Sequence, residues 1–287
     1  MPSRSASIAR PEVTKALTSP SLNDVQQRAL DSLRAEGIAV LRFPDLFGAD
    51  LWDELAADIE PFISEADEWA RRLGDRPMEK EDVIVRRFYK GQLARKKLTK
   101  FSLDSPWIRY AASRLLLDVV NAYAPEQRRL YYLDNWFTVP YPGASARVAS
   151  QRWHRDAEDE HVVKVFVYFS GVDEEAGPFE YVQRSAAGGE LGELWSWADG
   201  LRYPPPDEFE AAVPMADRLT LTGPAGTMII CDTGGFHRGG FARRKARVLS
   251  VSSYVPAERR EGMRRFKVDF AGGGEALPLQ VRFALTA

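Results

Sequence analysis

An almost unbroken apolar run, VVKVFVYF at residues 162–169, constrains the fold of this chain more than any other feature. A strand with one solvent-facing side alternates apolar and polar residues, whereas this run is apolar on both sides, as in a strand covered on both faces. Further short apolar or aromatic segments lie at residues 130–141, 179–182, 227–231 and 248–255. Gly and Pro separate several of them, so the pattern predicts a β-sandwich or barrel of many short strands.

The N-terminal third has the spacing of helices instead. An S-x-x-D pattern at residues 21–24 predicts a helix start, and Gly37 supplies the positive φ that ends a helix. A second helix is predicted over residues 50–73, with a break near Pro61, because proline removes a helical hydrogen bond. Ser105 is the expected N-cap of a third helix. We therefore expect helices packed on the β-rich part of the chain.

Acids and bases nearly cancel in this chain of 287 residues, with 39 Lys+Arg against 41 Asp+Glu. A dedicated nucleic-acid binder shows a basic excess or stripe, so no nucleic-acid partner is expected.

No apolar run approaches the roughly 18 residues that cross a bilayer, and residues 1–20 lack the apolar core of a secretory signal. The single cysteine, Cys231, excludes an intrachain disulfide. These features predict a cytoplasmic protein that does not bind membranes.

The segment Trp153-His154-Arg155-Asp156 contains the first candidate for chemistry. Side chains two residues apart in a strand project to the same face, so His154 and Asp156 would offer an imidazole nitrogen and a carboxylate to one point. His237, which follows another apolar strand, is the best candidate for a third ligand. Two histidines and one carboxylate leave three positions open on Fe(II), enough for a chelating cosubstrate and O2. Taken alone, His-x-Asp is weak evidence and favours a surface or core histidine with a polar neighbour over a metal site.

Arg247 follows His237 by ten residues and begins another predicted strand. A dicarboxylate cosubstrate buried in a barrel needs a charge-assisted partner for its distal carboxylate, and a guanidinium provides one. Arg243, Arg244 and Lys245 compete for this role, but they lie in the turn, where side chains face solvent more often. Arg247 is therefore the favoured anchor.

Four segments together carry a resemblance to a known family: SQRWHRDAED, KVFVYFSGVDEEAGPFEYVQRS, GTMIICDTGGFHRGG and RVLSVSSYV. They are similar to the phytanoyl-CoA dioxygenase-like branch of the Fe(II)/2-oxoglutarate oxygenases. The resemblance covers roughly residues 130–256, with a weaker similarity in GIAVLRFPDLF at residues 37–47. In combination these motifs are specific for the enzyme class and unspecific for the substrate.

The resemblance implies a mainly β fold with flanking helices, built on a double-stranded β-helix (jelly-roll, cupin-like) core with a helical N-terminal region. We accordingly expect a flexible N-terminal arm over residues 1–20 and a single oxygenase domain over residues 21–287. Within that domain, residues 21–128 would form the helical support and residues 129–260 the jelly-roll core. The long, loosely ordered stretch at about residues 186–216 would be a lid-like insertion.

The resemblance also implies His154, Asp156 and His237 as the iron ligands and Arg247 as the 2-oxoglutarate anchor, with Fe(II), 2-oxoglutarate and O2 as cofactors. Halogenases of this kind carry a small residue in place of the carboxylate, so Asp156 favours hydroxylation or another oxidation. The chain departs from the family at QRSA (residues 183–186), where P-G-S-H is frequent, and two residues after the distal histidine, where Gly239 replaces a hydroxyl-bearing residue. Arg247 would then use a different helper, or a water.

Other candidates have two interpretations each. Trp136 would wall the cosubstrate pocket or pack in the core. Lys164 lies in the apolar strand and needs an anionic partner, either a buried acid or 2-oxoglutarate. His161 lies in an acidic run, where we expect an exposed, ion-paired histidine. Three aromatic residues of the long loop would cover substrate or pin the loop to the body: Trp195, Trp197 and Tyr203.

The predicted function is a 2-oxoglutarate-dependent dioxygenase that oxidises an unactivated C–H bond of a small-molecule metabolite or natural-product intermediate. Four basic residues would allow that molecule to be anionic: Arg86, Arg87, Lys90 and Arg155. Two alternatives stay open at this point. One is a metal-dependent cupin-like enzyme that does not use 2-oxoglutarate, and the other is a non-catalytic ligand-binding jelly-roll domain.

Overall fold

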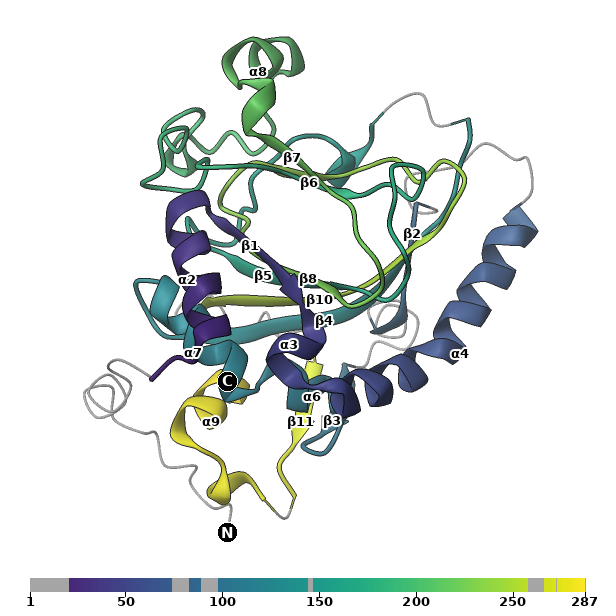
Figure 1. Cartoon of the computed structure of the whole chain (residues 1–287), viewed down its shortest axis with the longest axis vertical. Helices are drawn as coiled ribbons and strands as arrows, with labels where there is room; N and C mark the ends of the chain where they lie inside the picture. The colour runs from purple at the N-terminus through teal and green to yellow at the C-terminus, as the bar shows by residue number, and fades with distance from the viewer. Residues whose placement is uncertain are drawn as a thin grey trace.

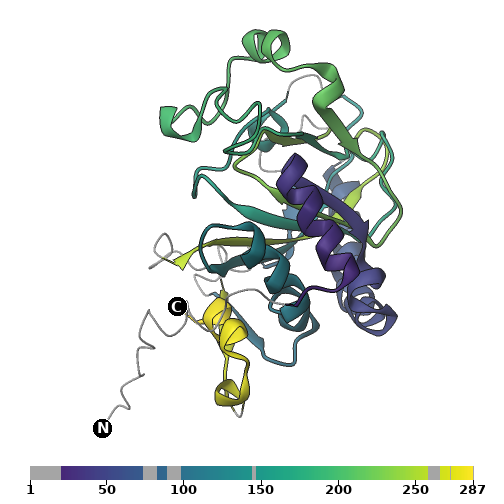
Figure 2. The same ribbon diagram turned by 60° about the vertical axis from the view of Figure 1, so that its left-hand side comes forward.

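The computed structural model describes residues 21–73, 83–88, 98–143, 147–257, 266–271 and 273–286; the arm predicted for residues 1–20 lies outside them. Two antiparallel sheets face each other, and helices cover the outer face of the larger sheet (Figures 1 and 2). The described part of the chain is thus mostly antiparallel sheet with some helices, in agreement with the expected mainly β composition.

The larger sheet has six strands in the order β1 (Ile38–Arg42), β8 (Thr227–Asp232), β5 (Val163–Tyr168), β10 (Arg247–Pro256), β4 (Arg128–Thr138) and β2 (Ile84–Arg86). The smaller sheet has three strands in the order β7 (Arg218–Leu221), β6 (Phe179–Val182) and β9 (His237–Gly239). A separate parallel pair joins β11 (Phe266–Asp269) to β3 (Thr99–Ser102). All strand pairings within the six-stranded sheet and within the three-stranded sheet are antiparallel.

Strand β5 explains the apolar run that dominates the sequence. Val163, Val165 and Val167 point to the cluster that the sheet shares with the helices. Phe166 and Tyr168 point the other way, into the cluster between the two sheets. Every residue of β5 is buried, and all of them except Lys164 are apolar or aromatic, so the prediction of a strand covered on both faces is confirmed.

The first helix, α2 (Asp24–Glu36), ends at Gly37 with φ 76°, as predicted. The residues that cap its start differ from the predicted ones, Ser21 and Asp24. Asn23 is the N-cap, and it forms a capping box with Gln26 in which each side chain accepts a hydrogen bond from the other residue's backbone N–H. The S-x-x-D pattern at Ser21 and Asp24 is therefore not the cap, because the amide pair of Asn23 and Gln26 satisfies the orphan donors.

Helix α4 (Ala49–Leu73) runs past Pro61 without the predicted break. Its buried residues, Leu55, Ile59, Phe62 and Ala66, recur every three or four positions and hold one face against the core. That burial outweighs the loss of one backbone hydrogen bond at the exposed proline. The third helix is in fact two, α6 (Pro106–Ala111) and α7 (Arg114–Tyr123). Ser105 is the N-cap residue of α6, as predicted, although its side chain makes no capping hydrogen bond. Short helices α3 (Phe43–Phe47), α8 (Pro206–Ala212) and α9 (Leu279–Leu285) complete the set used below.

The stretch at residues 186–216 is not structureless. It contains α8, which lies beyond the smaller sheet in Figure 1. Phe209 of α8 packs with Trp153 and Phe236 in a third buried cluster, so this part of the stretch is attached to the body. Within the described ranges, no helix has the length and apolarity needed to cross a membrane.

Candidate metal centre

The two segments that carry the predicted ligands pair with each other directly. His154 forms an isolated antiparallel bridge with His237 at the start of β9, through reciprocal N–H···O bonds of 3.1 and 3.0 Å. Two residues on, the backbone N–H of Asp156 donates to the carbonyl of Thr233 at 2.9 Å. The His154 segment is therefore an extended bridge and not the full strand that was predicted. The i, i+2 geometry still holds, and it places both side chains on the same side.

His154, Asp156 and His237 come together at one buried point. Each is at most 5% exposed, and one ligand atom from each lies within 4.8 Å of the others. The imidazole ring centroids of the two histidines are 4.2 Å apart, and His237 Nε2 is 3.8 Å from Asp156 Oδ2. Two nitrogens and a carboxylate at this spacing fit an iron site.

Backbone carbonyls orient both imidazoles. His154 Nδ1–H donates to the Arg152 carbonyl at 2.8 Å, and His237 Nδ1–H donates to the Gly235 carbonyl at 3.0 Å. This assignment leaves each Nε2 unprotonated, which is the form that binds a metal. Burial lowers the pKa of His154, and it lowers the pKa of His237 well below its ordinary value. Both rings are therefore neutral at neutral pH, so cation binding displaces no proton from them.

Asp156 is paired with Lys164 of β5, whose Nζ is 2.5 Å from Asp156 Oδ2. Burial by itself raises the pKa of Asp156, but the charge of Lys164, together with the interactions with the two histidines, outweighs burial and holds that pKa well below its usual range. Burial would likewise lower the pKa of Lys164, and the charge of Asp156 raises it above the ordinary value instead. Of the two interpretations of Lys164, the structure shows the buried acid.

A cavity of about 270 Å³ opens beside the three side chains. Trp136, Lys164 and Arg247 all line it, together with the three predicted ligands. The lining also includes residues that the sequence did not single out, namely Tyr132, Thr138, Ser150, Gln151 and Glu158. For two of them the sequence holds a signal, because Tyr132 and Thr138 lie four residues before and two residues after Trp136 in β4 and therefore share its side of the strand.

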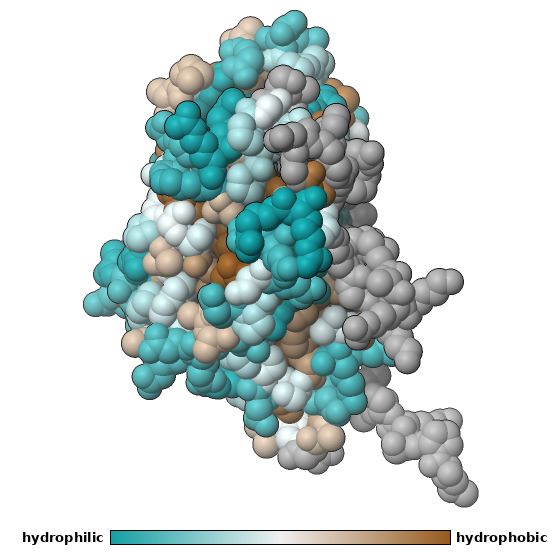
Figure 3. All heavy atoms as spheres, turned by 90° about the vertical axis from the view of Figure 1, so that its right-hand side faces the viewer, coloured by the Kyte–Doolittle hydropathy of each residue, from teal (hydrophilic) through white to brown (hydrophobic). Residues whose placement is uncertain are grey.

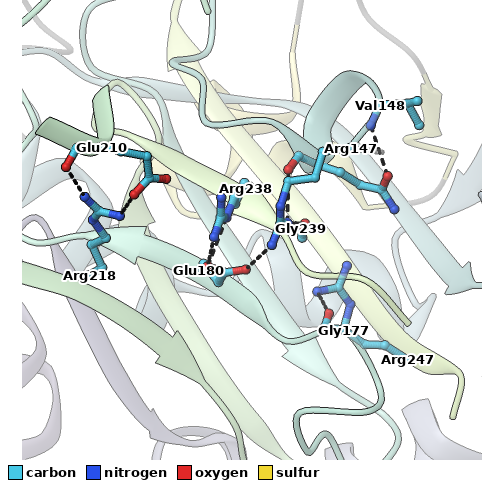
Figure 4. A network of polar contacts seen from close by, with 10 residues as sticks. Arg147, Val148, Gly177, Glu180, Glu210, Arg218, Arg238, Gly239 and Arg247 are labelled. Atoms are coloured by element: carbon cyan, nitrogen blue, oxygen red, sulfur yellow. Dashed lines mark hydrogen bonds and ion pairs between the residues drawn. The ribbon is translucent and has the colours of Figure 1, made fainter. Parts of the chain in front are cut away.

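Arg247 begins β10 and is buried at the cavity wall. Its Nη1 donates to the carbonyl of Gly177 (Figure 4), and its Nη2 lies 3.4 Å from Thr138 Oγ1. Its Nε is buried without a hydrogen-bond partner among the described residues. Burial lowers the pKa of Arg247, and the interaction with Tyr168 opposes that shift. A buried guanidinium whose Nε–H is unused fits an anionic ligand in this cavity.

The surroundings of Arg247 show which groups take the place of the hydroxyl that the family often has at position 239. A Cβ at position 239 would lie 3.4 Å from Arg247 Nη2, so a hydroxyl-bearing residue there would contact the guanidinium. In this chain Thr138 and Tyr168 supply the neighbouring hydroxyl groups from β4 and β5 instead. The competing side chains of the turn are exposed, since Arg244 pairs with Glu175 and Lys245 with Asp173 at the surface.

The segment that leads into His154 is held by an arginine network that the sequence did not reveal. Arg147 donates to the carbonyls of Gln151 and Gly239 at 3.2 and 3.3 Å and contacts Glu180 at 3.4 Å (Figure 4). Glu180 of β6 also accepts two bonds from Arg238 of β9, at 2.9 and 2.6 Å. These bonds tie residues 147–151 to the smaller sheet and so limit the movement of the His154 segment.

Arg155 does not face the cavity, which corrects its predicted role toward an anionic substrate. It alternates with His154 and Asp156 and points the opposite way, where it is buried. Its guanidinium donates to backbone carbonyls of six residues: Ser185, Leu191, Gly192, Leu194, Trp195 and Gly234. Arg155 therefore ties the start of the long stretch at residues 186–216 to the metal-ligand segment.

Of the other basic residues that favoured an anionic substrate, one lines the cavity and one does not. Arg86 lines the cavity and lies 4.9 Å over the ring of Trp136. Arg87 is instead paired with Asp58 at 2.6 Å and is not part of the lining. Lys90 lies outside the described residues. Arg202, which the sequence did not single out, also lines the cavity.

Two of the three aromatic residues of the long stretch have different surroundings. Trp195 packs against Phe209 and Phe236, so it attaches the stretch to the body. Tyr203 stacks on His154 with ring centroids 5.5 Å apart and therefore lies beside the metal centre. The side chain of Trp197 is not among those described.

His161 is paired, as predicted, but with a different acid and in a more buried place. Its Nδ1 is 2.7 Å from Asp232 Oδ2, and Asp232 is fully buried. The hydrogen bond to Asp232 raises the pKa of His161, and burial opposes the shift. From the sequence, the expected partners of His161 were the acidic residues next to it in the chain. Only the fold shows that β8 ends beside His161 and brings Asp232 to it. Cys231, which precedes Asp232 in β8, is a buried strand residue.

No known family profile matches this chain, and neither does any curated protein. Solved structures do match. One is the "non-heme alpha ketoglutarate dependent epimerase SnoN from nogalamycin biosynthesis", at 17% identity and TM-score 0.50 over 81% of this chain and 83% of that one. A second structure of SnoN, in complex with Fe3+, alpha ketoglutarate and nogalamycin RO, matches at 18% identity and TM-score 0.50 over 81% and 84%.

AviO1 from Streptomyces viridochromogenes Tue57 matches at 15% identity and TM-score 0.51, over 83% of this chain and 97% of that one. This chain shares the fold of these proteins. The SnoN complex shows that the fold holds iron and 2-oxoglutarate together in another protein. The particular similarity to phytanoyl-CoA dioxygenases stays a prediction.

Proposed function

We propose that this chain is an Fe(II)- and 2-oxoglutarate-dependent oxygenase of the phytanoyl-CoA dioxygenase-like kind, with a double-stranded β-helix core formed by the two facing sheets. The observation that carries the proposal is the convergence of His154, Asp156 and His237. Their ligand atoms lie within 4.8 Å of one another, beside a cavity that contains the buried Arg247. In this proposal residues 21–287 form one domain, and the stretch at residues 186–216 covers the metal centre through Tyr203.

The three side chains would hold Fe(II), and Arg247 would hold the distal carboxylate of 2-oxoglutarate. When bound, the iron and 2-oxoglutarate together supply the activation of O2 that allows oxidation of an unactivated C–H bond. The chain's own contribution is to orient ligands and to exclude water. Backbone carbonyls fix the imidazoles, Lys164 holds one oxygen of Asp156, and Trp136 walls the cavity.

For the substrate we propose a small molecule with an acidic group. Two observations support it: Arg86 and Arg202 both line the cavity in addition to Arg247. Apolar lining residues, among them Ile84 and Phe166, suit the rest of such a molecule. The face of the molecule on the right-hand side of Figure 1 has hydrophobic residues (brown) between hydrophilic ones (teal), as Figure 3 shows. SnoN was crystallised with the small molecule nogalamycin RO.

The purified protein, freed of metal and then supplied with Fe(II), ascorbate and 2-oxoglutarate, should convert 2-oxoglutarate to succinate without added substrate at a slow rate. The same protein with a chelator, or with Zn(II) in place of Fe(II), should not. Iron binding without any 2-oxoglutarate turnover would instead favour a cupin-like enzyme that does not use 2-oxoglutarate. Absence of metal binding would favour a non-catalytic domain.

A further inference from the structure

The Lys164–Asp156 pair is unusual among the ion pairs of the described residues because both side chains are almost fully buried, at 8% and 4% exposure. Lys164 faces inward from β5, and its strand neighbours in register are Cys231 and Ser253, neither of which carries a negative charge that would hold an ammonium group. The ring of Tyr132, 5.7 Å away, adds a weaker cation–π contact. Asp156 is the acid with which Lys164 forms an ion pair within the described ranges.

Asp156 is at the same time one of the three groups that converge on the candidate metal centre. A cation held there would be separated from the Lys164 ammonium only by the carboxylate they share. Two neutral imidazoles, one carboxylate and one ammonium give this centre a net charge of zero before a metal binds. Without the ammonium, the same ligands carry a charge of −1. The lysine therefore opposes the binding of a cation and favours the binding of an anion at the same point.

We propose that Lys164 sets the charge balance of the metal centre: it weakens the hold of the site on a divalent cation and strengthens the hold of the loaded site on dianionic 2-oxoglutarate. This inference rests on the proposed function, since it assigns Lys164 a part in binding both groups. It separates Lys164 from Arg247, which would contact the distal carboxylate of 2-oxoglutarate and has no ion pair with a metal ligand.

The test measures the affinity of the protein for Mn(II) and its affinity for 2-oxoglutarate. Loss of a lysine with a purely structural role would not change these two affinities in opposite directions. Mn(II) binding to the metal-free protein is followed by the electron paramagnetic resonance signal of free Mn(II). Binding of 2-oxoglutarate to the Mn(II)-loaded protein is then measured by calorimetry. For K164M we expect Mn(II) to bind about tenfold more tightly and 2-oxoglutarate about tenfold more weakly, the scale of a coupling between neighbouring sites. K164Q, which keeps a hydrogen-bond donor without the charge, should behave in the same way.

K164R keeps the charge and should leave both affinities within about threefold of the wild type. K100M removes a lysine charge from an exposed pair with Asp269 and serves as the matched control, with no change expected. If both affinities of folded K164M and K164Q move in the same direction, or if neither moves, the inference is wrong. A wild-type protein that binds Mn(II) but not 2-oxoglutarate would refute the proposed function, and the Mn(II) measurement would still decide the effect of Lys164 on the cation.

Discussion

Two buried groupings of histidine and aspartate lie close together in the chain and differ in how their polar atoms are used. Asp232, at the end of β8, accepts hydrogen bonds from four donors: Tyr123 Oη, His161 Nδ1, and the backbone N–H groups of Val162 and Gly234. Asp156 has one charged partner, Lys164, and lies beside two imidazoles whose Nδ1–H groups donate to backbone carbonyls instead of to Asp156.

The comparison shows what separates a structural grouping from a metal centre. Around Asp232 the protein supplies the donors itself, and the carboxylate is satisfied by the fold. Around Asp156 the imidazole protons are turned away toward backbone carbonyls, and three acceptors converge on one point. The Lys164 ammonium offsets the charge of Asp156, but the Nε2 lone pairs of both imidazoles stay without a donor, which is unfavourable in a buried place unless a cation binds them. Residue composition alone does not distinguish the two groupings, but substitutions in each of them do.

Removing a ligand of the metal centre should have the largest effect. For His154→Ala or Asp156→Ala we expect at least about a 100-fold loss of Fe(II)-dependent succinate formation, since the remaining two ligands hold the metal poorly. Metal content and succinate are measured on the same preparation. His161→Ala is the matched control, because it removes the histidine of the other grouping, and it should stay within about threefold of the wild type. Turnover near the wild-type rate in either ligand variant would refute the ligand assignment.

Loss of the cosubstrate anchor should come next. Arg247→Ala removes a buried charge-assisted interaction, typically about 1.5–3 kcal/mol, so the KM for 2-oxoglutarate should rise about 10- to 100-fold. Metal affinity should stay unchanged, because Arg247 contacts none of the three ligands. Arg244→Ala, at an exposed pair with Glu175, controls for the loss of charge. An unchanged KM in the Arg247 variant would exclude it from the anchor role.

Disrupting the second grouping should affect stability instead of chemistry. Asp232→Ala leaves several buried donors without an acceptor, so the free energy of unfolding should fall by about 2–4 kcal/mol. Thermal unfolding would show this as a lower Tm, while the fraction that stays folded should bind metal with ordinary stoichiometry. A variant that keeps its Tm and loses its metal would mean that Asp232 belongs to the metal centre.

The smallest expected effect is a pH dependence of stability. The hydrogen bond to Asp232 raises the pKa of His161 above its ordinary value of 6.5. A raised pKa in the folded state means that the stabilisation is fully present below pH 6.5 and is lost as the pH rises through the folded-state pKa. The wild type should therefore exceed His161→Gln in Tm by about 2–4 °C at pH 5.5, with a smaller difference at pH 8.5. A difference that grows with pH would contradict this assignment.

Much of the local structure could be predicted because it depends on neighbours in sequence. The doubly apolar run predicts a strand covered on both faces, and Gly37 predicts the end of α2. His154 and Asp156 share one side of an extended segment because alternation is a local property of the backbone. By the same property Arg155 must point away from them, but only the fold shows that backbone carbonyls of six residues surround it.

The sequence by itself determined which side chains were available for chemistry: three histidines, few enough to consider one by one, and a carboxylate at the right spacing from the first. Only the tertiary structure decided that His237 and not His161 lies against His154, because the pairing of β9 with the His154 segment is a contact across 83 positions of the chain. It also decided that Lys164 meets Asp156. Long-range strand pairing depends on the packing of the whole core, and no local pattern encodes it.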